Sequence, residues 1–394
     1  MSRTPPMNAK PTSMIPSQRA LFDIPDDIAY LNCAYMSPLM KSAAKAGEQA
    51  IAEKMRPWGT SSEDFFTNSE KTRALFAEII GAETDGISFV PSASYGITVA
   101  ATNIPVGEGQ EILVLAEQFP SNVYAWERAA QEQGAEVATV RAPAITPEGP
   151  DWTPAILDAI TDRTDIVALP HCHWTDGALI DLVTISKKAR KVGAALVLDV
   201  SQSLGALPLD LDRIKPDFMV APTYKWLLGP YAMGFLYVAP KWRDGRPIEE
   251  NWLNRKGSEN FAGLVDYEDA YQPGARRFDM GERANFQLMT MTKQALEQIA
   301  EWGLDNIAAT LQTKTDAIAV RAQKLGLTVS ASHLRAPHFL GVRFPGGGPE
   351  GLLDELAKRQ VFVSLRGTSL RVTPHLYNTD EDVDRLFAAL EAVL

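Results

Sequence analysis

The chain has 394 residues, more than one compact core usually holds, so a large domain and a second, smaller one are expected. Its composition, 45% hydrophobic and 22% charged, is typical of a globular protein, and its net charge of −11 disfavours a nucleic-acid partner. No apolar run approaches the ~18 residues of a membrane span. Two cysteines, Cys33 and Cys172, are too few for a disulfide framework, which favours a reducing, cytoplasmic location.

The N-terminal part of the chain divides into an arm and two helices. Residues 1–18 contain four prolines and no apolar periodicity, which predicts a flexible arm over residues 1–20 rather than a secretory signal. Apolar residues at helical spacing predict helices over residues 38–55 and 63–80.

Short apolar runs then alternate with amphipathic segments as far as residue 238. The alternation predicts an α/β fold, with a mostly parallel, seven-stranded-type sheet flanked by helices in a large domain over residues 21–285. Ligands of such sheets bind beyond the carboxyl ends of the strands. The predicted strands cover residues 87–90, 112–115, 137–140, 166–169, 196–200, 218–220 and 233–238, and the predicted helices between them cover residues 121–133, 153–160 and 184–191.

The pattern changes after about residue 281, where long helical segments and short strands predict a small C-terminal α+β domain over residues 286–394. No GxGxxG or GxxxxGK[ST] motif follows a predicted strand, which disfavours a dinucleotide site or a P-loop. The predicted helices cover residues 288–302, 304–325, 351–359 and 381–393, and the predicted strands cover residues 327–330, 339–343, 361–364 and 370–373.

Two charged residues stand where successive predicted strands end. Asp199 closes the apolar run LVLD, where a carboxylate is costly unless it meets a cation; a helix cap beside Ser201 is the alternative. Lys225 follows the next strand and precedes a glycine-containing turn, where a desolvated amine acts as a nucleophile; a surface lysine is the alternative. Together they form the pair that a pyridoxal 5'-phosphate (PLP) enzyme needs, a lysine for the Schiff base and an aspartate that keeps the pyridine nitrogen protonated.

The same block resembles the class V aminotransferase family of fold type I PLP enzymes. Its residues read D-x-[SA]-[HQ] from Asp199 and K-x-x-x-G-P from Lys225, and the resemblance extends from about residue 30 to the C-terminus. It implies that Gln202 contacts the phenolic oxygen of the cofactor. Glutamine at this place is typical of the cysteine desulfurase-like branch of the family.

Two further segments are similar to kynureninases within this family. FPSNVYAW (119–126) resembles F-P-S-D-x-Y-A, and LPHCHWTDG (169–177) resembles L-x-H-V-x-Y-x-x-G. The resemblance implies that Phe119 stacks on the cofactor ring, and that Tyr224 contacts the phosphate and donates a proton. Gln202 departs from the histidine of kynureninases, and Thr175 departs from their basic residue.

The kynureninase resemblance also implies an assembly. Trp252 and Asn285 fall where that group uses a tryptophan and an asparagine donated to the cofactor or substrate by the neighbouring subunit. A homodimer with shared active sites is therefore expected.

The cofactor phosphate and the substrate carboxylate each need a binding group. Ala93 and Ser94 lie between a strand and a helix, where N–H groups bind an anion; a plain cap by Ser92 is the alternative. Arg371 offers a planar fork for a carboxylate and falls where the family places its substrate arginine; a surface ion pair is the alternative. Arg366 is a second candidate.

His171 is a candidate substrate contact, although a core histidine or an acid–base group fits its sequence equally well. The five histidines show no metal-ligand spacing, so no metal site is expected. No cysteine stands between Val361 and Arg371, where a desulfurase carries its sulfur-transfer cysteine, so no protein persulfide is expected.

The resulting prediction is a PLP-dependent enzyme that acts on an α-amino acid, with a kynureninase-like hydrolase or lyase cleaving at Cβ as the first choice. Transamination is the alternative, followed by cysteine desulfuration or C–S lysis and by epimerisation. A non-catalytic binding protein is disfavoured, because binding alone needs neither Lys225 nor Asp199.

Overall fold

The computed structural model describes residues 13–394, and residues 1–12 of the expected arm lie outside the described residues. Residues 13–18 have no regular structure but are held by hydrogen bonds. The Ser13 N–H donates to Asn306 Oδ1 at 2.8 Å, and the Gln18 N–H donates to the Leu376 carbonyl at 2.8 Å. The described end of the arm therefore packs against the C-terminal part of the chain.

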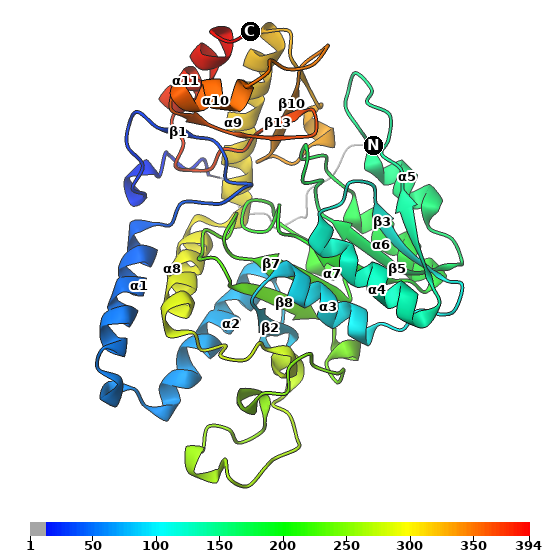
Figure 1. Cartoon of the computed structure of the whole chain (residues 1–394), viewed down its shortest axis with the longest axis vertical. Coiled ribbons are helices and arrows are strands. Elements are labelled where there is room, and N and C mark those ends of the chain that lie inside the picture. Colours follow the sequence, from blue (N-terminus) through cyan, green and yellow to red (C-terminus); the bar gives the residue numbers. More distant parts are fainter. Residues whose placement is uncertain (1–12) are drawn as a thin grey trace.

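A seven-stranded sheet forms the centre of the molecule (Figure 1), in the order β2-β8-β7-β6-β5-β3-β4. Strand β8 runs opposite to the other six strands of this sheet, so the predicted mostly parallel sheet is confirmed. The strands are β2 (Ile87–Val90), β3 (Glu111–Leu115), β4 (Glu136–Val140), β5 (Thr164–Pro170), β6 (Ala195–Asp199), β7 (Phe218–Pro222) and β8 (Gly234–Val238).

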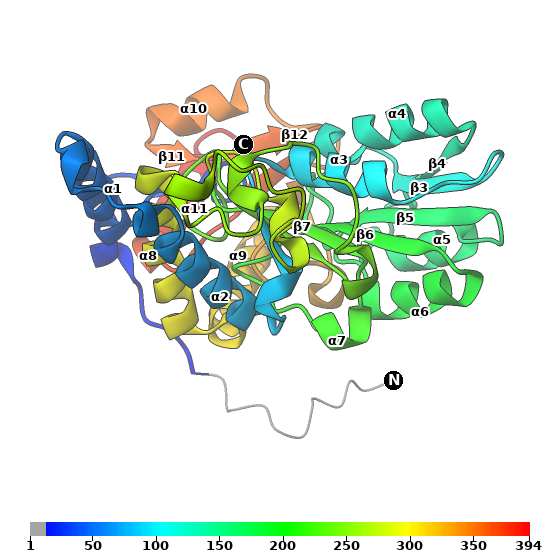
Figure 2. The ribbon, with the colours of Figure 1, turned by 90° about the horizontal axis from the view of Figure 1, so that it is seen from below.

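Both faces of this sheet are covered by helices, because alternate residues of each strand point to opposite sides. On β3, Ile112 and Val114 pack on one face, and Leu113 and Leu115 pack on the other. Figure 2 shows α3 (Ala93–Asn103) and α4 (Tyr124–Gln133) above the sheet, and α5 (Trp152–Ala159), α6 (Leu182–Val192) and α7 (Leu211–Ile214) below it.

A second layer of long helices packs on the N-terminal side. The predicted helix over residues 38–55 is α1 (Lys41–Lys54), whereas the one over residues 63–80 is divided into a 3₁₀ turn (Ser62–Phe65) and α2 (Thr67–Ile80). They lie beside α8 (Phe286–Trp302) in Figure 1. Within residues 13–394, no helix combines the length and the apolar character needed to cross a membrane.

The C-terminal part contains a four-stranded antiparallel sheet in the order β12-β13-β10-β9, as expected for a small α+β unit (Figure 1). Its strands are β9 (Thr328–Val329), β10 (Leu340–Arg343), β12 (Ser364–Arg366) and β13 (Ser369–Val372), and its helices are α9 (Leu304–Lys324), α10 (Leu352–Lys358) and α11 (Asp380–Glu391).

One short pairing joins the two ends of the chain. Strand β1 (Ala29–Tyr30) pairs in parallel with β11 (Val361–Phe362), and Leu31 belongs to the C-terminal core. Residues 29–31 therefore pack with the C-terminal unit, although they precede the large sheet in sequence. The division of the chain at about residue 285 stays a prediction.

Candidate active site

A cavity of about 230 Å³ lies at the carboxyl ends of the parallel strands. Its wall is formed by the segments that follow β2, β3, β5, β6 and β7, and by the loop before β8. Because β8 is antiparallel, its first residue lies at the same edge as the ends of its neighbours. Seven residues singled out from the sequence line this cavity together: Ala93, Ser94, Phe119, Asp199, Gln202, Tyr224 and Lys225.

Lys225 is a buried amine inside this cavity. Only 6% of the residue is exposed, and its Nζ lies 5.3 Å from the ring centroid of Tyr224 and 5.5 Å from that of Phe119. Burial lowers the pKa of Lys225 to about 8; the charge of Asp199 opposes this shift, and that of Arg371 adds to it. A lysine with a lowered pKa carries more neutral amine near neutral pH, as a nucleophile or base requires.

Asp199 faces the same cavity from the neighbouring strand, since β6 and β7 pair in parallel at Asp199 and Val220. The residue is 6% exposed, and its Oδ1 accepts hydrogen bonds from the N–H of Ser201 at 2.9 Å and from the Ser201 hydroxyl. Turns rather than a helix follow Asp199, so it is not a helix cap. The structure thus places a buried carboxylate close to a buried amine.

Gln202 is held in one orientation by its neighbours. Its Nε2 donates to the Ala34 carbonyl at 3.1 Å, and its Oε1 accepts from the indole N–H of Trp226 at 3.1 Å. The Gln202 backbone carbonyl accepts from His338 Nε2 at 2.6 Å. Because the indole fixes which end of the amide is the oxygen, Nε2 carries a second N–H, and no residue of the described chain accepts a hydrogen bond from it.

The start of α3 provides a cradle for an anion. Ser92 caps the helix, since its Oγ accepts from the Tyr95 N–H at 3.2 Å, and the hydroxyls of Ser92 and Ser94 lie 2.9 Å apart. The N–H groups of Ala93 and Ser94 have no acceptor in the described part of the chain. Free N–H groups in the first turn of a helix favour a phosphate, so this cavity wall fits the PLP phosphate.

Arg371 lies beside the cavity on β13 and is only 1% exposed. Its Nε donates to the Ser364 hydroxyl at 2.8 Å, and its Nη1 donates to the carbonyl of Trp174, a residue of the cavity wall, at 3.1 Å. No carboxylate of residues 13–394 forms an ion pair with it, so it is not a surface ion pair. Burial, and secondly the charge of Arg366, lowers the pKa of Arg371 to about 9.

Three of the predicted site residues lie elsewhere in this chain. His171 lines a separate cavity beside α6, and burial lowers its pKa to about 4, which keeps the ring neutral. Trp252 packs against Phe65, with centroids 5.9 Å apart, and Asn285 caps α8 by accepting from the Leu288 N–H at 3.2 Å. Because the resemblance assigns Trp252 and Asn285 to the neighbouring subunit's site, their roles stay predictions.

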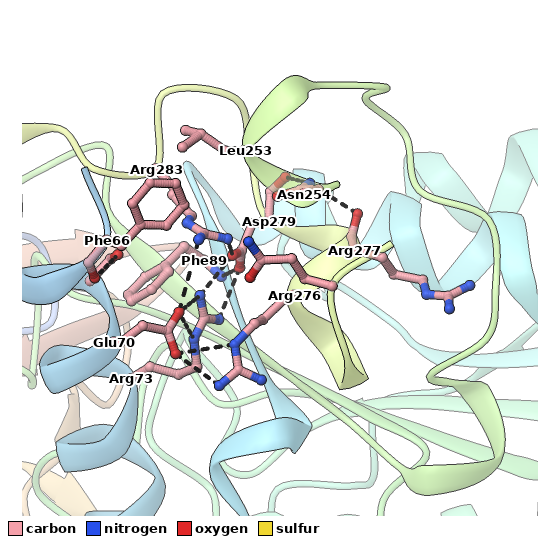
Figure 3. A network of polar contacts seen from close by, with 12 residues as sticks. Phe66, Glu70, Arg73, Phe89, Leu253, Asn254, Arg276, Arg277, Asp279 and Arg283 are labelled. Carbon is pink, nitrogen blue, oxygen red and sulfur yellow. Dashed lines mark hydrogen bonds and ion pairs between the residues drawn. The ribbon is translucent and has the colours of Figure 1, made fainter. Parts of the chain in front are cut away.

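A buried ion network supports the segment before Asn285 and is shown in Figure 3. The carboxylate of Asp279 accepts from Arg73 at 2.7 Å and from Arg283 at 2.6 Å, and it also accepts from the Phe89 N–H at 2.7 Å. These bonds tie residues 279–283 to α2 and β2. Since β2 leads directly into α3, the network also supports the anion cradle.

Sequence reasoning missed several residues of the cavity wall. The ring of Trp174 meets that of Phe119 edge-on, with centroids 5.3 Å apart. The ring centroid of Tyr231 lies 4.7 Å from that of Tyr224. Trp174 lies within the matched segment 169–177, and Tyr231 directly follows the K-x-x-x-G-P motif, which was the available signal. Cys172 also lines the wall, and its Sγ donates to the Gln202 carbonyl at 3.3 Å.

The second cysteine also lies near the cavity lysine. The Sγ of Cys33 is 3.8 Å from the Lys225 carbonyl. Burial raises the pKa of both thiols well above the usual range. Cys33 and Cys172 therefore stay protonated, and a protonated thiol is a poor nucleophile.

Comparison with known proteins identifies the family of this chain. The family model described as Aminotransferase class-V matches residues 36–386. An uncharacterized aminotransferase, YcbU, of Bacillus subtilis (strain 168) is 27% identical over 328 residues, which cover 82% of this chain and 84% of that protein. Isopenicillin N epimerase of Streptomyces clavuligerus is 26% identical over 334 residues, with the same two coverages of 82% and 84%. Kynureninase of Pseudomonas fluorescens is 27% identical over 329 residues, 79% of this chain and 71% of that protein.

Solved structures share the fold over nearly the whole chain. A cysteine desulfurase from Thermococcus onnurineus NA1 superposes with a TM-score of 0.82 at 18% identity, covering 97% of this chain and 99% of that one. A variant of C-DES with glycine covalently linked to its PLP cofactor superposes with a TM-score of 0.86 at 18% identity, covering 96% and 100%. The chain therefore belongs to the class-V aminotransferase family and is a PLP-dependent enzyme of fold type I.

Proposed function

We propose that this enzyme binds an α-amino acid through its carboxylate and cleaves a bond at Cβ, as a kynureninase-like hydrolase or lyase. The observation that carries the proposal is the phenol of Tyr224, which lines the cavity beside Lys225. Burial, and then the nearby Tyr231 and Asp199, raise the pKa of Tyr224 to about 12. The phenol therefore carries its proton at neutral pH and can donate it inside the cavity.

The residues of the cavity wall suit the cofactor. When bound, PLP supplies an electron sink for the carbanion that forms at the substrate Cα. Ala93 and Ser94 would hold its phosphate through their free N–H groups, and Asp199 would keep its ring nitrogen protonated. Gln202 would donate its free amide N–H to the ring oxygen, and Phe119 would cover one face of the ring.

Arg371 and Lys225 would act together on the substrate. Arg371 offers a buried guanidinium that has no acidic partner among residues 13–394 and can bind the α-carboxylate. Because its charge lowers the pKa of Lys225, a carboxylate bound to Arg371 offsets that effect and makes the amine a stronger base. Lys225 then accepts the Cα proton at the moment when the substrate is in place.

Tyr224 would complete the reaction by giving its proton to the carbanion that develops at Cβ when the bond breaks. Positioned proton transfer of this kind contributes about 10²–10⁴-fold in rate. Cysteine desulfuration through a protein persulfide is disfavoured, because it needs a thiolate and the thiols of Cys33 and Cys172 stay protonated.

We also propose that two chains form a homodimer in which Trp252 and Asn285 complete the partner's site. The segment that carries Trp252 projects from the body of the molecule at the bottom of Figure 1. It exposes Val265 (79%) and Tyr267 (96%), and exposed apolar side chains favour association. Sedimentation should show a dimer, and a fully active monomer would contradict the proposal.

The replacement Tyr224→Phe tests the Cβ reaction, with kynurenine and a cysteine conjugate as substrates and no added keto acid. The variant should keep the cofactor and still exchange the substrate Cα proton in heavy water, but it should form the Cβ product about 10²–10⁴-fold more slowly. Tyr124→Phe, on the exposed side of α4, is the control. Conversion of the cofactor to its pyridoxamine form, with rescue by a keto acid, would establish transamination instead.

A further inference from the structure

Three arginines lie on one face of the C-terminal antiparallel sheet. On β13, Arg371 lies opposite Ser364 of β12 and Gly341 of β10. Two residues earlier on β13, Ser369 lies opposite Arg366 of β12 and Arg343 of β10. Because every second residue of a strand points to the same side, Arg343, Arg366 and Arg371 share that side. The side is the one that faces the cavity, since Arg371 bonds to the Trp174 carbonyl.

These arginines differ in their partners. Arg343 is paired with the carboxylate of Asp176. Neither Arg366 nor Arg371 has an acidic partner in the part of the chain that the structure describes; Arg366 donates only to the Leu365 carbonyl, at 2.7 Å. Like charges on one face of a sheet destabilise it, and a buried unpaired charge is costly. An anion that binds between the two arginines would relieve both costs.

The ring of Trp174 links this pair of charges to the cavity. The guanidinium carbon of Arg366 lies 5.7 Å from its centroid, and that of Arg371 lies 5.9 Å from it. Trp174 itself is part of the cavity wall. Arg371 is buried, whereas Arg366 is half-buried near the turn of the β12–β13 hairpin, so the two charges lie at different depths beside the ring of Trp174.

We propose that the substrate is an amino acid whose side chain carries a second carboxylate, with Arg371 binding the α-carboxylate and Arg366 binding the distal one. The proposal rests on the proposed function only for the statement that an α-amino acid enters this cavity. It adds the substrate class, a dicarboxylic amino acid, and assigns Arg366 as the residue that selects it.

Binding to the holoenzyme tests the proposal without turnover. The change in cofactor absorbance is titrated with L-glutamate against L-glutamine and with L-aspartate against L-asparagine, because each pair differs mainly in charge. We expect the acid of at least one pair to bind about 10- to 100-fold more tightly than its amide, as one charge-assisted hydrogen bond implies.

Variants identify the residue responsible. Arg366→Gln should abolish the preference for the acid over its amide by weakening the binding of the acid alone. Arg366→Lys should restore most of this preference because the charge is kept. Arg359→Gln, which removes an arginine paired with Glu355 on α10, is the matched control and should keep the preference.

Equal binding of acid and amide by the parent enzyme would overturn the proposal. The proposal would also be overturned if Arg366→Gln weakened the binding of acid and amide by the same factor, because both arginines would then bind the α-carboxylate. A preserved acid preference without any Cβ product would leave the substrate class standing and reject the proposed Cβ cleavage.

Discussion

Replacement of Arg371 by glutamine should test recognition of the substrate carboxylate directly. The change removes a buried positive charge but keeps a side chain that forms hydrogen bonds. A charge-assisted hydrogen bond contributes about 1.5–3 kcal/mol, and each 1.36 kcal/mol corresponds to a factor of ten. Arg371 has no acidic partner in the described chain to compete for it, so the full contribution is available to the substrate. We therefore expect amino-acid binding to weaken by about 10- to 100-fold.

The same replacement should alter Lys225. Because the charge of Arg371 disfavours protonation of the amine, its removal should move the pKa of Lys225 upward from about 8. Less neutral amine is then present between pH 7 and 8. Acylation of the lysine in cofactor-free protein, followed against pH by mass spectrometry of the Lys225 peptide, measures this shift.

The decisive assay compares an amino acid with the amine that lacks its carboxylate. Both are titrated into the holoenzyme, and the cofactor absorbance is recorded. Arg371→Gln should weaken the amino acid and leave the amine unchanged within about twofold. Arg343→Gln, which removes an arginine of the same sheet face that is already paired with Asp176, is the control for general damage to the sheet. Equal weakening of amine and amino acid, or no weakening at all, would refute the assignment of Arg371.

Three further predictions concern the groups around the cofactor. Borohydride reduction of the holoenzyme should fix the cofactor to Lys225, and Lys225→Ala should abolish this attachment; a reduced adduct on another lysine would reject the site. In cofactor-free protein, the acylation rate of Lys225 should rise with pH through a midpoint of about 8, because burial lowers the pKa of the amine from 10.5. The amine is protonated below that pH and neutral above it. A midpoint near 10.5 would show that the amine is solvated. The double variant Cys33→Ser with Cys172→Ser should keep both cofactor and turnover, because both thiols stay protonated; lost turnover with bound cofactor would indicate a persulfide route.

Local sequence patterns were sufficient for the large sheet and for placing Asp199 and Lys225 at one edge of it. The strands β5, β6 and β7 are apolar runs, because both faces of a parallel sheet are covered. Asp199 and Lys225 could be found because each follows such a run, and the ends of parallel strands meet at one edge. The cradle at Ala93 was also visible, because a serine between a strand and a helix marks a helix start.

Other features depend on contacts between residues far apart in sequence. The pairing of β1 with β11 and the short strand β12 leave almost no periodic pattern, since each has only two or three residues. Cys33 and Lys225 are separated by 192 positions, yet their atoms lie 3.8 Å apart. No spacing rule brings such residues together.

The charges of the C-terminal sheet show the difference between what local sequence predicts and what depends on contacts in the folded chain. The sequence predicts Arg371 on a short strand over residues 370–373 and Arg366 just after the strand over residues 361–364, and it leaves open whether each has an acidic partner. In the folded chain Arg343 pairs with Asp176, whereas the guanidinium carbons of Arg366 and Arg371 lie 5.7 and 5.9 Å from the ring centroid of Trp174, a residue of the cavity wall. Periodicity in a sequence reports which residues are buried, whereas the partner of a buried charge depends on distances that exist only after the chain has folded.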